Sequence, residues 1–507
     1  MKRIHLISAI FLLIVHCVYF YGWTMDDPYI SYRYAQNVVE GKGFVFNEGE
    51  RVEGYSNFLF VLILATAYKL GIDLIIFSRL IGLIFSILIL LLIYLMLARE
   101  SKDDKSTNLL SCLSLYLLAL SAPFAMWAVG GLETSLFALL LLLAVITFIK
   151  HEESPNKKSL YPILTGLFLI LLSLTRPEGF IIFGAFVLYK IIMLIFYKDK
   201  LNKFDFLWSG IFLIGFIIYN FWRIKYFGQI LPNTFYAKAT GALAQQLQNG
   251  IIYSINFLSQ NGSVLFFLII VPFIFKNRFQ KRHGIILTTI FSYLFFIIYC
   301  GGDWMPIYRF FVPIIPLLMI MINEGLIIIF EKLKLNDIDF KKRDFAALIV
   351  VLVLVTNLYF ERKETLPIMY AVRTGTLTGQ YEEVAKWMKT NLPADSVFAG
   401  AEAGIIPYYS GFKFIDIIGL VDAHVAHQPG QMHEKTDVDY VLGRQPDFIL
   451  LHTHLQLDES GYPLMGYYPF DNKFLQNPQF KLNYRILNKF IRGNEKYGQN
   501  YFVLFER

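Results

Sequence analysis

The chain has 507 residues, of which 56% are hydrophobic and 17% are charged. Charged residues make up about 25% of an average soluble domain, so this composition excludes both a soluble globular protein of this size and a disordered chain. The net charge of +7 gives no reason to expect a nucleic-acid partner, because membrane proteins collect lysine and arginine in their cytoplasmic loops.

Apolar runs close to the length of about 20 residues that spans a bilayer recur along the first two thirds of the chain. We expect membrane segments at about 4–22, 56–72, 77–98, 109–129, 135–150, 160–175, 180–197, 206–225, 262–275, 285–299, 309–330 and 344–360. The first run follows Lys2 and Arg3 and has no small-residue cleavage site after it, which favours an uncleaved signal anchor.

The basic residues between these runs predict how the chain crosses the membrane. Five loops rich in lysine and arginine, together with Lys2 and Arg3, are expected in the cytoplasm by the positive-inside rule. The loops expected on the outer face are 23–55, 130–134, 176–178, 226–250 and 301–309. This alternation requires that one early run does not cross, and we expect 56–72 to be re-entrant or only partly embedded. About eleven crossings remain, with a cytoplasmic N-terminus.

The composition changes near residue 361, where polar and apolar residues mix as they do in soluble domains. Helical spacing covers 379–391, and the runs 397–400, 414–418, 448–451 and 501–505 are typical of strands. About 145 residues are enough for one small α/β domain. The expected fold is therefore an α-helical polytopic membrane domain over residues 1–360, with an outer loop at 23–55, and a periplasmic or extracellular α/β domain over 361–507.

The strongest chemical signal is the acidic pair Asp26–Asp27, which follows the first apolar run. Neighbouring carboxylates repel each other, and this raises the pKa of one of them and suits a general base. The pair could equally hold a divalent cation such as Mg²⁺ or Mn²⁺. It could also cap a helix that begins at Pro28. These residues alone leave all three interpretations open.

Further motifs surround this pair on the expected outer face. They are Ile-Ser-Tyr-Arg-Tyr at 30–34, Gly-Phe-Val-Phe-Asn at 43–47, Glu-Gly-Tyr-Ser-Asn at 53–57, Gly-Gly-Leu-Glu-Thr at 130–134, Thr-Arg-Pro-Glu-Gly at 175–179, Leu-Pro-Asn-Thr-Phe-Tyr-Ala-Lys at 231–238, Gly-Gly-Asp-Trp-Met-Pro-Ile-Tyr-Arg-Phe at 301–310 and Asp-Ile-Ile-Gly-Leu-Val-Asp at 416–422. This set resembles the GT-C membrane glycosyltransferases that use polyprenyl-phosphate sugars. It is similar in particular to the mycobacterial terminal β-arabinofuranosyltransferase group.

The resemblance implies that one carboxylate of the pair is the general base, and we favour Asp27 over Asp26. The outer-face cations able to hold the donor phosphate are Arg33, Arg51, Arg176, Lys238 and Arg309. The expected substrate-binding residues are Tyr29, Tyr32, Glu53, Asn57, Glu133, Glu178, Asn233, Tyr236, Asp303 and Trp304. Each has a structural alternative: an interfacial anchor for a cation, or a helix cap or ion pair for an acid, such as Arg176 with Glu178.

The tail contains further polar residues at expected strand ends. Glu402, Asp416 and Asp422 could bind an acceptor glycan, although a structural role in the domain is favoured. Two histidine pairs, His424 with His427 and His452 with His454, have no clear third ligand, so we do not expect a zinc site.

The function that the resemblance implies is transfer of a sugar from a polyprenyl-phosphate donor to a cell-envelope glycan or glycolipid, at the outer face of the cytoplasmic membrane. The sequence offers no second dedicated nucleophile, which favours a single displacement and hence inversion of the anomeric carbon. Two other classes remain. A transporter or flippase of a lipid-linked saccharide would place ionisable residues near the bilayer midplane and show inverted repeats, whereas here the acids lie at the outer boundary and no repeat is visible. A non-catalytic scaffold of envelope assembly would use the tail as its binding module.

Overall fold

A computed structural model describes residues 2–100, 112–153, 160–238, 243–261, 265–275, 279–332, 362–363, 365–370, 379–431, 434–454, 457–458, 462–492 and 500–507. The chain divides into two compact units, each assembled from three segments. We call Met1–Trp23, Ser78–Tyr219 and Ala244–Ile368 the bundle unit, and Thr24–Phe77, Asn220–Leu243 and Met369–Arg507 the sheet unit.

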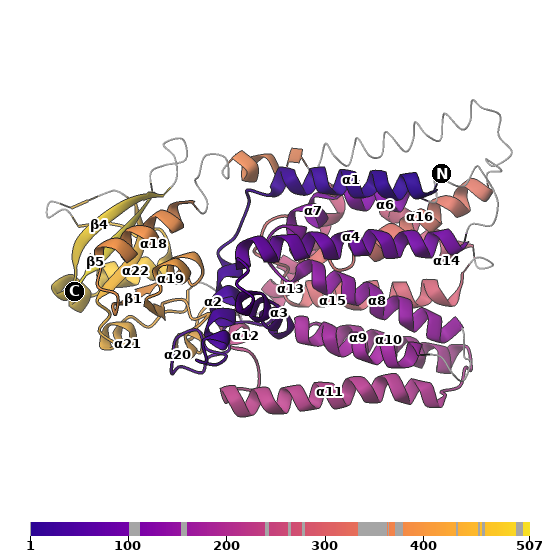
Figure 1. The fold of residues 1–507 in the computed structure, drawn as a ribbon, viewed down its shortest axis with the longest axis horizontal. Helices are drawn as coiled ribbons and strands as arrows, with labels where there is room; N and C mark the ends of the chain where they lie inside the picture. The colour runs from indigo at the N-terminus through magenta and orange to yellow at the C-terminus, as the bar shows by residue number, and fades with distance from the viewer. Residues whose placement is uncertain are drawn as a thin grey trace. The chain divides into compact units, whose positions relative to one another are not determined.

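The bundle unit consists of long apolar helices (Figure 1). Its main helices are α1 (Lys2–Phe20), α4 (Leu74–Glu100), α8 (Thr134–Glu153), α9 (Tyr161–Thr175), α10 (Gly179–Phe196), α11 (Lys203–Phe227), α13 (Leu243–Gln260), α15 (Lys281–Tyr299) and α16 (Ile315–Lys332). Among the described residues, six helices are long and apolar enough to cross a membrane, or seven if α13 and Leu265–Ile274 form one bent span. The protein is thus a multi-pass membrane protein, but the expected eleven crossings are not confirmed.

Two of the expected membrane segments take a different form in the described residues. The run 109–129 is broken into α6 (Leu113–Ala119) and α7 (Ala122–Ala128). The break precedes Pro123, because proline lacks an N–H group and disfavours helical backbone in the residue before it. The run 262–275 contains the 3₁₀ helix η2 (Leu265–Ile270) and the single turn α14 (Val271–Ile274). The run 344–360 and the expected boundary at 361 lie outside the described residues.

The structure also bears on two further expectations, the partial membrane segment at 56–72 and the outer loop at 226–250. In the run 56–72, α3 (Phe58–Lys69) has 12 residues, or about 18 Å at 1.5 Å per residue. It is too short for a hydrocarbon core of about 30 Å, in agreement with the expectation of a partial segment. The outer loop expected at 226–250 is partly helical instead, because it contains α12 (Asn233–Lys238) and the start of α13.

The sheet unit contains α2 (Asp27–Val39), α3, α12 and an α/β domain. The domain has five strands, β1 (Val397–Gly400), β2 (Lys413–Asp416), β3 (Phe448–His454), β4 (Arg485–Arg492) and β5 (Asn500–Glu506), in the order β2-β1-β3-β5-β4. Strands β2, β1 and β3 are parallel, whereas β5 is antiparallel to both β3 and β4. The helices are α18 (Gly379–Asn391), α19 (Ile405–Ser410), α20 (Ala423–Ala426), α21 (Val438–Gly443), α22 (Pro469–Gln476) and α23 (Pro478–Asn483).

The four expected strands are present, and β4 is the strand that sequence patterns missed. The central strand β3 is buried along nearly its whole length, and its Ile449 pairs with Phe505 of β5 inside the apolar core. The carboxyl ends of the parallel strands, at Gly400 and Asp416, lie at one edge of the sheet. Ligands of open α/β sheets bind outside this edge.

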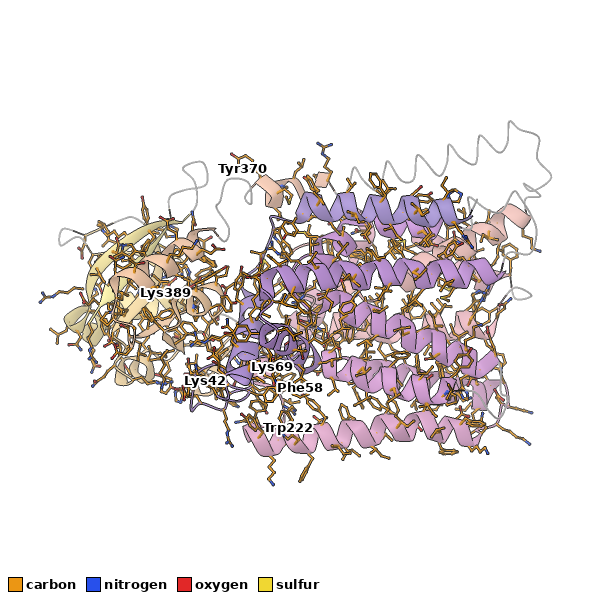
Figure 2. All side chains as sticks on the ribbon, viewed as in Figure 1. Lys42, Phe58, Lys69, Trp222, Tyr370 and Lys389 are labelled. Atoms are coloured by element: carbon orange, nitrogen blue, oxygen red, sulfur yellow. The ribbon has the colours of Figure 1, made fainter. Side chains whose placement is uncertain are left out.

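An aromatic cluster joins Phe44 and Phe58, the first residue of α3, to Trp222 near the end of α11 within the sheet unit. The rings of Phe58 and Trp222 have centroids 5.2 Å apart (Figure 2). Phe44 contacts both of these rings at 5.4 and 5.5 Å. The loop 23–55 is therefore packed against its own unit at this point.

Candidate active site

The acidic pair lies at the start of α2, and its two members have different environments. Asp26 precedes the helix, but its side chain makes no capping bond to α2. Its two carboxylate oxygens instead accept hydrogen bonds from the backbone N–H groups of Gly404, at 2.7 Å, and Ile405, at 2.6 Å. Asp27 is the first residue of α2 and, like Asp26, is partly exposed. The loop that carries the pair is thus attached to the carboxyl edge of the sheet.

The charge on Asp26 is opposed by its surroundings. Burial, together with the negative charges of Glu402 and Asp27, raises the pKa of Asp26 to about 8, although the two N–H donors favour the carboxylate. Two neighbouring carboxylates with different environments can divide acid and base roles between them.

A buried histidine, His452, lies between the carboxylates of Glu402 and Asp471. His452 is fully buried, and its Nε2 lies 2.5 Å from Glu402 Oε1. Its Nδ1 lies 3.5 Å from Asp471 Oδ1. Asp471 is itself held by the backbone N–H groups of His452, at 3.0 Å, and Tyr468, at 2.9 Å. Burial disfavours the imidazolium, but Glu402 and Asp471 outweigh it and raise the pKa of His452 to about 9.

Arg33 has a structural position in the sheet unit. Its guanidinium donates to the backbone carbonyls of Phe46, Pro407 and Phe412 at 2.7–2.9 Å, and it also lies over the Phe46 ring at 4.4 Å. These contacts use all three guanidinium nitrogens and one face of the group. The geometry therefore favours a structural role for Arg33 over phosphate binding.

Glu53 and Asn233 connect neighbouring loops of the sheet unit. The buried Glu53 carboxylate accepts a 2.7 Å hydrogen bond from Arg223, and burial raises the pKa of Glu53 to about 7 although Arg223 lowers it. The Asn233 side chain donates to the carbonyls of Gly419 and Leu420 at 2.8 and 2.9 Å. Both expected substrate-binding residues therefore brace the protein itself.

Four tyrosines pack between α2 and α19. Tyr29 lies 5.1 Å from Tyr32, 5.4 Å from Tyr408 and 5.8 Å from Tyr409, measured between ring centroids. Tyr29 and Tyr32 are buried, whereas Tyr408 and Tyr409 are partly exposed. The partly exposed pair is the part of this cluster that a sugar ring could reach.

The remaining predicted residues of the sheet unit lie apart from the acidic pair or in local contacts. Asn57 donates to the hydroxyl of Ser31 at 3.0 Å, and Tyr236 stacks on His427 at 4.3 Å. Arg51 is exposed and covers the Tyr226 ring at 4.8 Å. Lys238 is the last residue of α12 and is partly exposed.

The aspartates of the motif 416–422 organise the loop after β2. The fully buried Asp416 accepts hydrogen bonds from the N–H groups of Ile418, Gly419 and Val421 at 2.8–3.0 Å. Burial raises its pKa to about 7 against these donors. Asp422 caps α20, and its carboxylate also accepts a 3.2 Å hydrogen bond from the Arg444 guanidinium. These geometries favour the structural role for both residues.

In the bundle unit, Arg176 binds two of the predicted acids at once. It donates to Glu133 at 2.5 Å and to Glu178, and both carboxylates are buried. One positive charge facing two negative charges cannot attract a phosphate by itself. The ion-pair alternative that the sequence left open for Arg176 and Glu178 is therefore the observed arrangement.

The loop 301–310 of the bundle unit holds a second ion pair. Arg309 donates to both oxygens of Asp303, at 2.6 and 3.2 Å, and lies 5.6 Å over the Trp127 ring. Ile307 has a φ of 55° and Tyr308 a φ of 49°, which costs non-glycine residues about 1–3 kcal/mol each. Trp304, in the same loop, is 47% exposed. Strained backbone of this kind concentrates at functional sites.

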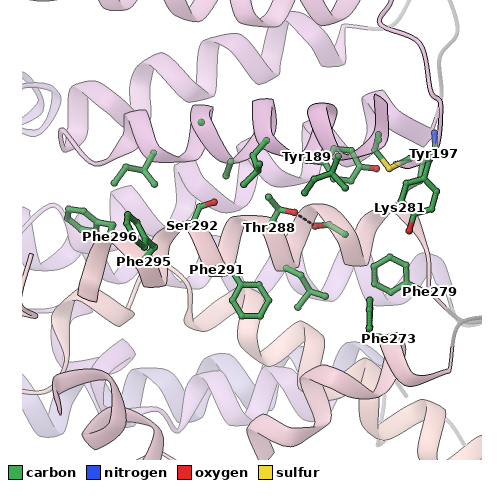
Figure 3. Close-up of a pocket in the computed structure, with 18 of the residues that line it drawn as sticks. Tyr189, Tyr197, Phe273, Phe279, Lys281, Thr288, Phe291, Ser292, Phe295 and Phe296 are labelled. Atoms are coloured by element: carbon green, nitrogen blue, oxygen red, sulfur yellow. Dashed lines mark hydrogen bonds between the residues drawn. The ribbon is translucent and has the colours of Figure 1, made fainter. Parts of the chain in front are cut away.

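A long apolar groove of about 990 Å³ lies between α10 and α15 (Figure 3). It is lined from Phe180 and Tyr299 at one end to Tyr197 and Lys281 at the other. Phe180 lies two residues after Glu178, and Tyr299 lies two residues before Gly301. The first end of the groove thus adjoins the loops that carry the two ion pairs. No motif in the sequence marked this groove, because apolar lining residues look like any membrane helix.

The described residues also contain one cluster with metal-ligand geometry, away from the predicted site. It consists of His151, Glu152 and Asp205. The Lys190 ammonium lies 2.9 Å from Glu152 and 3.2 Å from Asp205. The two carboxylates are therefore already paired with a cation of the protein. The cluster ties the ends of α8, α10 and α11 together.

Comparison with known proteins bears on the fold. A family model described as a domain of unknown function, DUF8728, matches residues 372–505, and no curated protein matches the sequence. ArnT from Cupriavidus metallidurans bound to undecaprenyl phosphate gives a TM-score of 0.56 at 12% identity, over 98% of this chain and 97% of that chain. The oligosaccharyltransferase of Archaeoglobus fulgidus in the apo form gives 0.55 at 15% identity, over 89% and 69%.

A third solved structure is arabinofuranosyltransferase AftD from mycobacteria, with a TM-score of 0.50 and 12% identity. The match covers 100% of this chain and 40% of that chain, so this protein spans less than half the length of that neighbour. Identities this low speak to the fold, and all three structures are GT-C glycosyltransferases. The chain therefore has the fold of the GT-C membrane glycosyltransferases.

Proposed function

We propose that this protein is a membrane glycosyltransferase that takes a sugar from a polyprenyl-phosphate donor and transfers it to a glycan or glycolipid of the cell envelope, outside the cytoplasmic membrane. The observation that carries the proposal is the groove between α10 and α15. Its lining residues follow α15 from Lys281 to Tyr299, about 27 Å at 1.5 Å per residue. The hydrocarbon core is about 30 Å thick, so the groove suits a chain-like isoprenoid lying along the helices.

The polarity of the groove supports a lipid more than a polar solute. Of the described residues that line it, Lys281 alone is charged, and it lies at the end remote from Phe180. A transporter for a saccharide would need polar partners along its path. The isoprenoid chain would lie along the apolar lining of the groove, with its phosphate and sugar outside that lining.

The reaction needs a base and a way to stabilise the departing phosphate. An aspartate of the pair, Asp27 in our assignment, removes the proton from an acceptor hydroxyl. The hydroxyl oxygen bonds to the anomeric carbon, the bond from that carbon to the phosphate oxygen breaks, and the phosphate remains on the lipid. A single displacement of this kind inverts the anomeric carbon. Arg33, Arg176 and Arg309 contact other protein groups, and Arg51 and Lys238 are kept as proposed phosphate ligands on the resemblance alone.

A divalent cation would have to bind Asp26 or Asp27. Both Asp26 oxygens already accept backbone N–H bonds, and such donors repel a cation. The residues present thus fit a cation poorly at Asp26, and we assign no step to a metal.

The direct test is to incubate the purified full-length protein in lipid nanodiscs with a panel of polyprenyl-phosphate sugars and an envelope glycan extract. We expect one lipid-linked sugar to be consumed and a glycosylated product to form. Flux of intact donor across vesicles without any new glycosidic bond would favour the flippase. Glycan binding without turnover of any donor would favour the scaffold.

A further inference from the structure

Asp26 and Arg33 hold the short helix α19 at its two ends. The Asp26 carboxylate accepts hydrogen bonds from the two backbone N–H groups at the start of α19. Arg33 lies about two helical turns later along α2 and donates to the carbonyls of Pro407, the third residue of α19, and of Phe412, two residues after the helix. The residue before α2 and a residue within it therefore both contact α19 and the turn after it.

Gly404 makes the close approach at the Asp26 end possible. A Cβ atom at this position would lie 1.9 Å from the backbone oxygen of Asp26 and 2.6 Å from its Cγ. Real Cβ atoms do not come this close to backbone atoms, so any side chain here would push α2 and α19 apart. The φ of −98° lies outside the left-handed region, and the contact with Asp26 is what a side chain at this position would break.

The space between the two polar ends is filled by aromatic rings. Tyr29 and Tyr32 of α2 interleave with Tyr408 and Tyr409 of α19, at centroid distances of 5.1–5.9 Å. Aromatic pairs at this separation contribute about 0.5–1.5 kcal/mol beyond the area that they bury. The two helices therefore form one packed element. Asp27 is the first residue of α2 and directly follows Asp26.

We propose that Asp26 is a positioning residue and not the catalytic base: together with Arg33 and Gly404 it fastens α2 to α19, and this contact fixes the place of Asp27. The proposal rests on the glycosyl transfer proposed above for the role of Asp27. Each Asp26 oxygen accepts an amide hydrogen bond from the start of α19, which holds this carboxylate against the α/β domain. The α/β domain is thus part of the active site and not an appended glycan-binding module.

The test compares Asp26→Asn, Asp27→Asn and Gly404→Ala in the full-length protein in nanodiscs. Each variant is measured twice, by its thermal unfolding midpoint and by steady-state transfer from the donor lipid that the wild type consumes. Matched controls are Asp395→Asn, at an exposed aspartate of the same domain, and Gly443→Ala, where an added Cβ meets no atom within 4 Å.

We expect Asp27→Asn to keep the wild-type midpoint and to lose transfer by at least about 100-fold, the usual worth of a general base. Asp26→Asn and Gly404→Ala should both lower the midpoint and reduce kcat by about 10-fold to 100-fold, the effect of displacing a catalytic group. The double variant Asp26→Asn/Gly404→Ala should have a midpoint and a kcat no lower than those of Gly404→Ala, because both substitutions break the same contact. The two controls should match the wild type.

Two results would overturn the proposal. One is loss of transfer in Asp26→Asn equal to that in Asp27→Asn with an unchanged midpoint, which would make Asp26 the base. The other is wild-type midpoints in both Asp26→Asn and Gly404→Ala, which would remove the contact between α2 and α19. If the wild type transfers no sugar, the proposed function fails, and the midpoints still decide whether Asp26 and Gly404 act together.

Discussion

The carboxylate of Glu53 accepts a 2.7 Å hydrogen bond from Arg223, and both side chains are buried. Glu53 also accepts a 3.0 Å backbone hydrogen bond from the N–H group of Asn233. Glu53 thus contacts both α11, through Arg223, and the first residue of α12, Asn233. These residues are far apart in the sequence, and two of them, Glu53 and Asn233, are ones that the resemblance assigned to substrate binding.

Replacing Arg223 by methionine should destabilise the protein, because it leaves the Glu53 carboxylate buried without its partner. Loss of one member of a buried ion pair costs about 3–5 kcal/mol. The double variant Glu53→Gln/Arg223→Met should recover part of this loss, since it leaves no buried charge. Unfolding midpoints measure both effects, and a double variant less stable than Arg223→Met would show that Glu53 has another, stronger partner.

His452 should make stability depend on pH. Burial lowers its pKa, but Glu402 and Asp471 outweigh burial and raise the pKa to about 9. Because the folded protein binds this proton more tightly than the unfolded chain, whose histidine has a pKa of about 6.5, the contribution is fully present below about pH 6.5. It is lost as the pH rises through about 9.

The unfolding midpoint of the wild type should therefore fall between pH 6.5 and 9, and His452→Gln should flatten this decline. His454→Gln is the matched control, because His454 lies in the same strand and packs against Tyr467. Identical pH slopes in the wild type and His452→Gln would show that the imidazole is neutral in the folded protein.

The groove gives a prediction that is independent of the acidic pair. Gly184 lines the groove, and a Cβ added there meets no atom within 4 Å, so a large side chain would occupy the groove without a clash in the backbone. Gly184→Phe should raise the KM for a long-chain donor by about 10-fold or more, the equivalent of about 1.4 kcal/mol of lost lipid contact. A short-chain donor should be affected less.

Gly210→Phe is the control for this change. Gly210 lies on α11, it also has open space around it, and it is absent from the groove lining. The KM for the long-chain donor should stay at the wild-type value in this variant. Equal effects of both substitutions on the KM would mean that the lipid chain lies elsewhere.

The sequence predicted elements better than it predicted partners. Pro28 located the start of α2, and apolar alternation located four of five strands, whereas β4 was missed because Arg485, Asn488 and Lys489 give it the polarity of a loop. The amide groups that hold Asp26 belong to residues 404 and 405, and no local pattern reveals a contact over that separation. Arg33 illustrates the same limit: a lone arginine in an outer loop looks like a phosphate ligand until its carbonyl partners are known.

The charges around Arg176 yield a prediction that separates folding from transfer. Arg176 binds Glu133 and Glu178 together, so removal of one carboxylate leaves a neutral pair, whereas removal of the arginine leaves two buried negative charges. Glu178→Gln should therefore keep the wild-type midpoint within about 1 kcal/mol in stability, and Arg176→Met should lose about 3–5 kcal/mol.

The triple variant Arg176→Met/Glu133→Gln/Glu178→Gln should recover most of that stability, because a neutral cluster carries no uncompensated charge. If the cluster only holds helices together, transfer should return with the fold. If its charges also orient the donor near the end of the groove, transfer should stay at least about 10-fold below the wild type while the midpoint recovers. Full recovery of both quantities would restrict Arg176, Glu133 and Glu178 to a structural role.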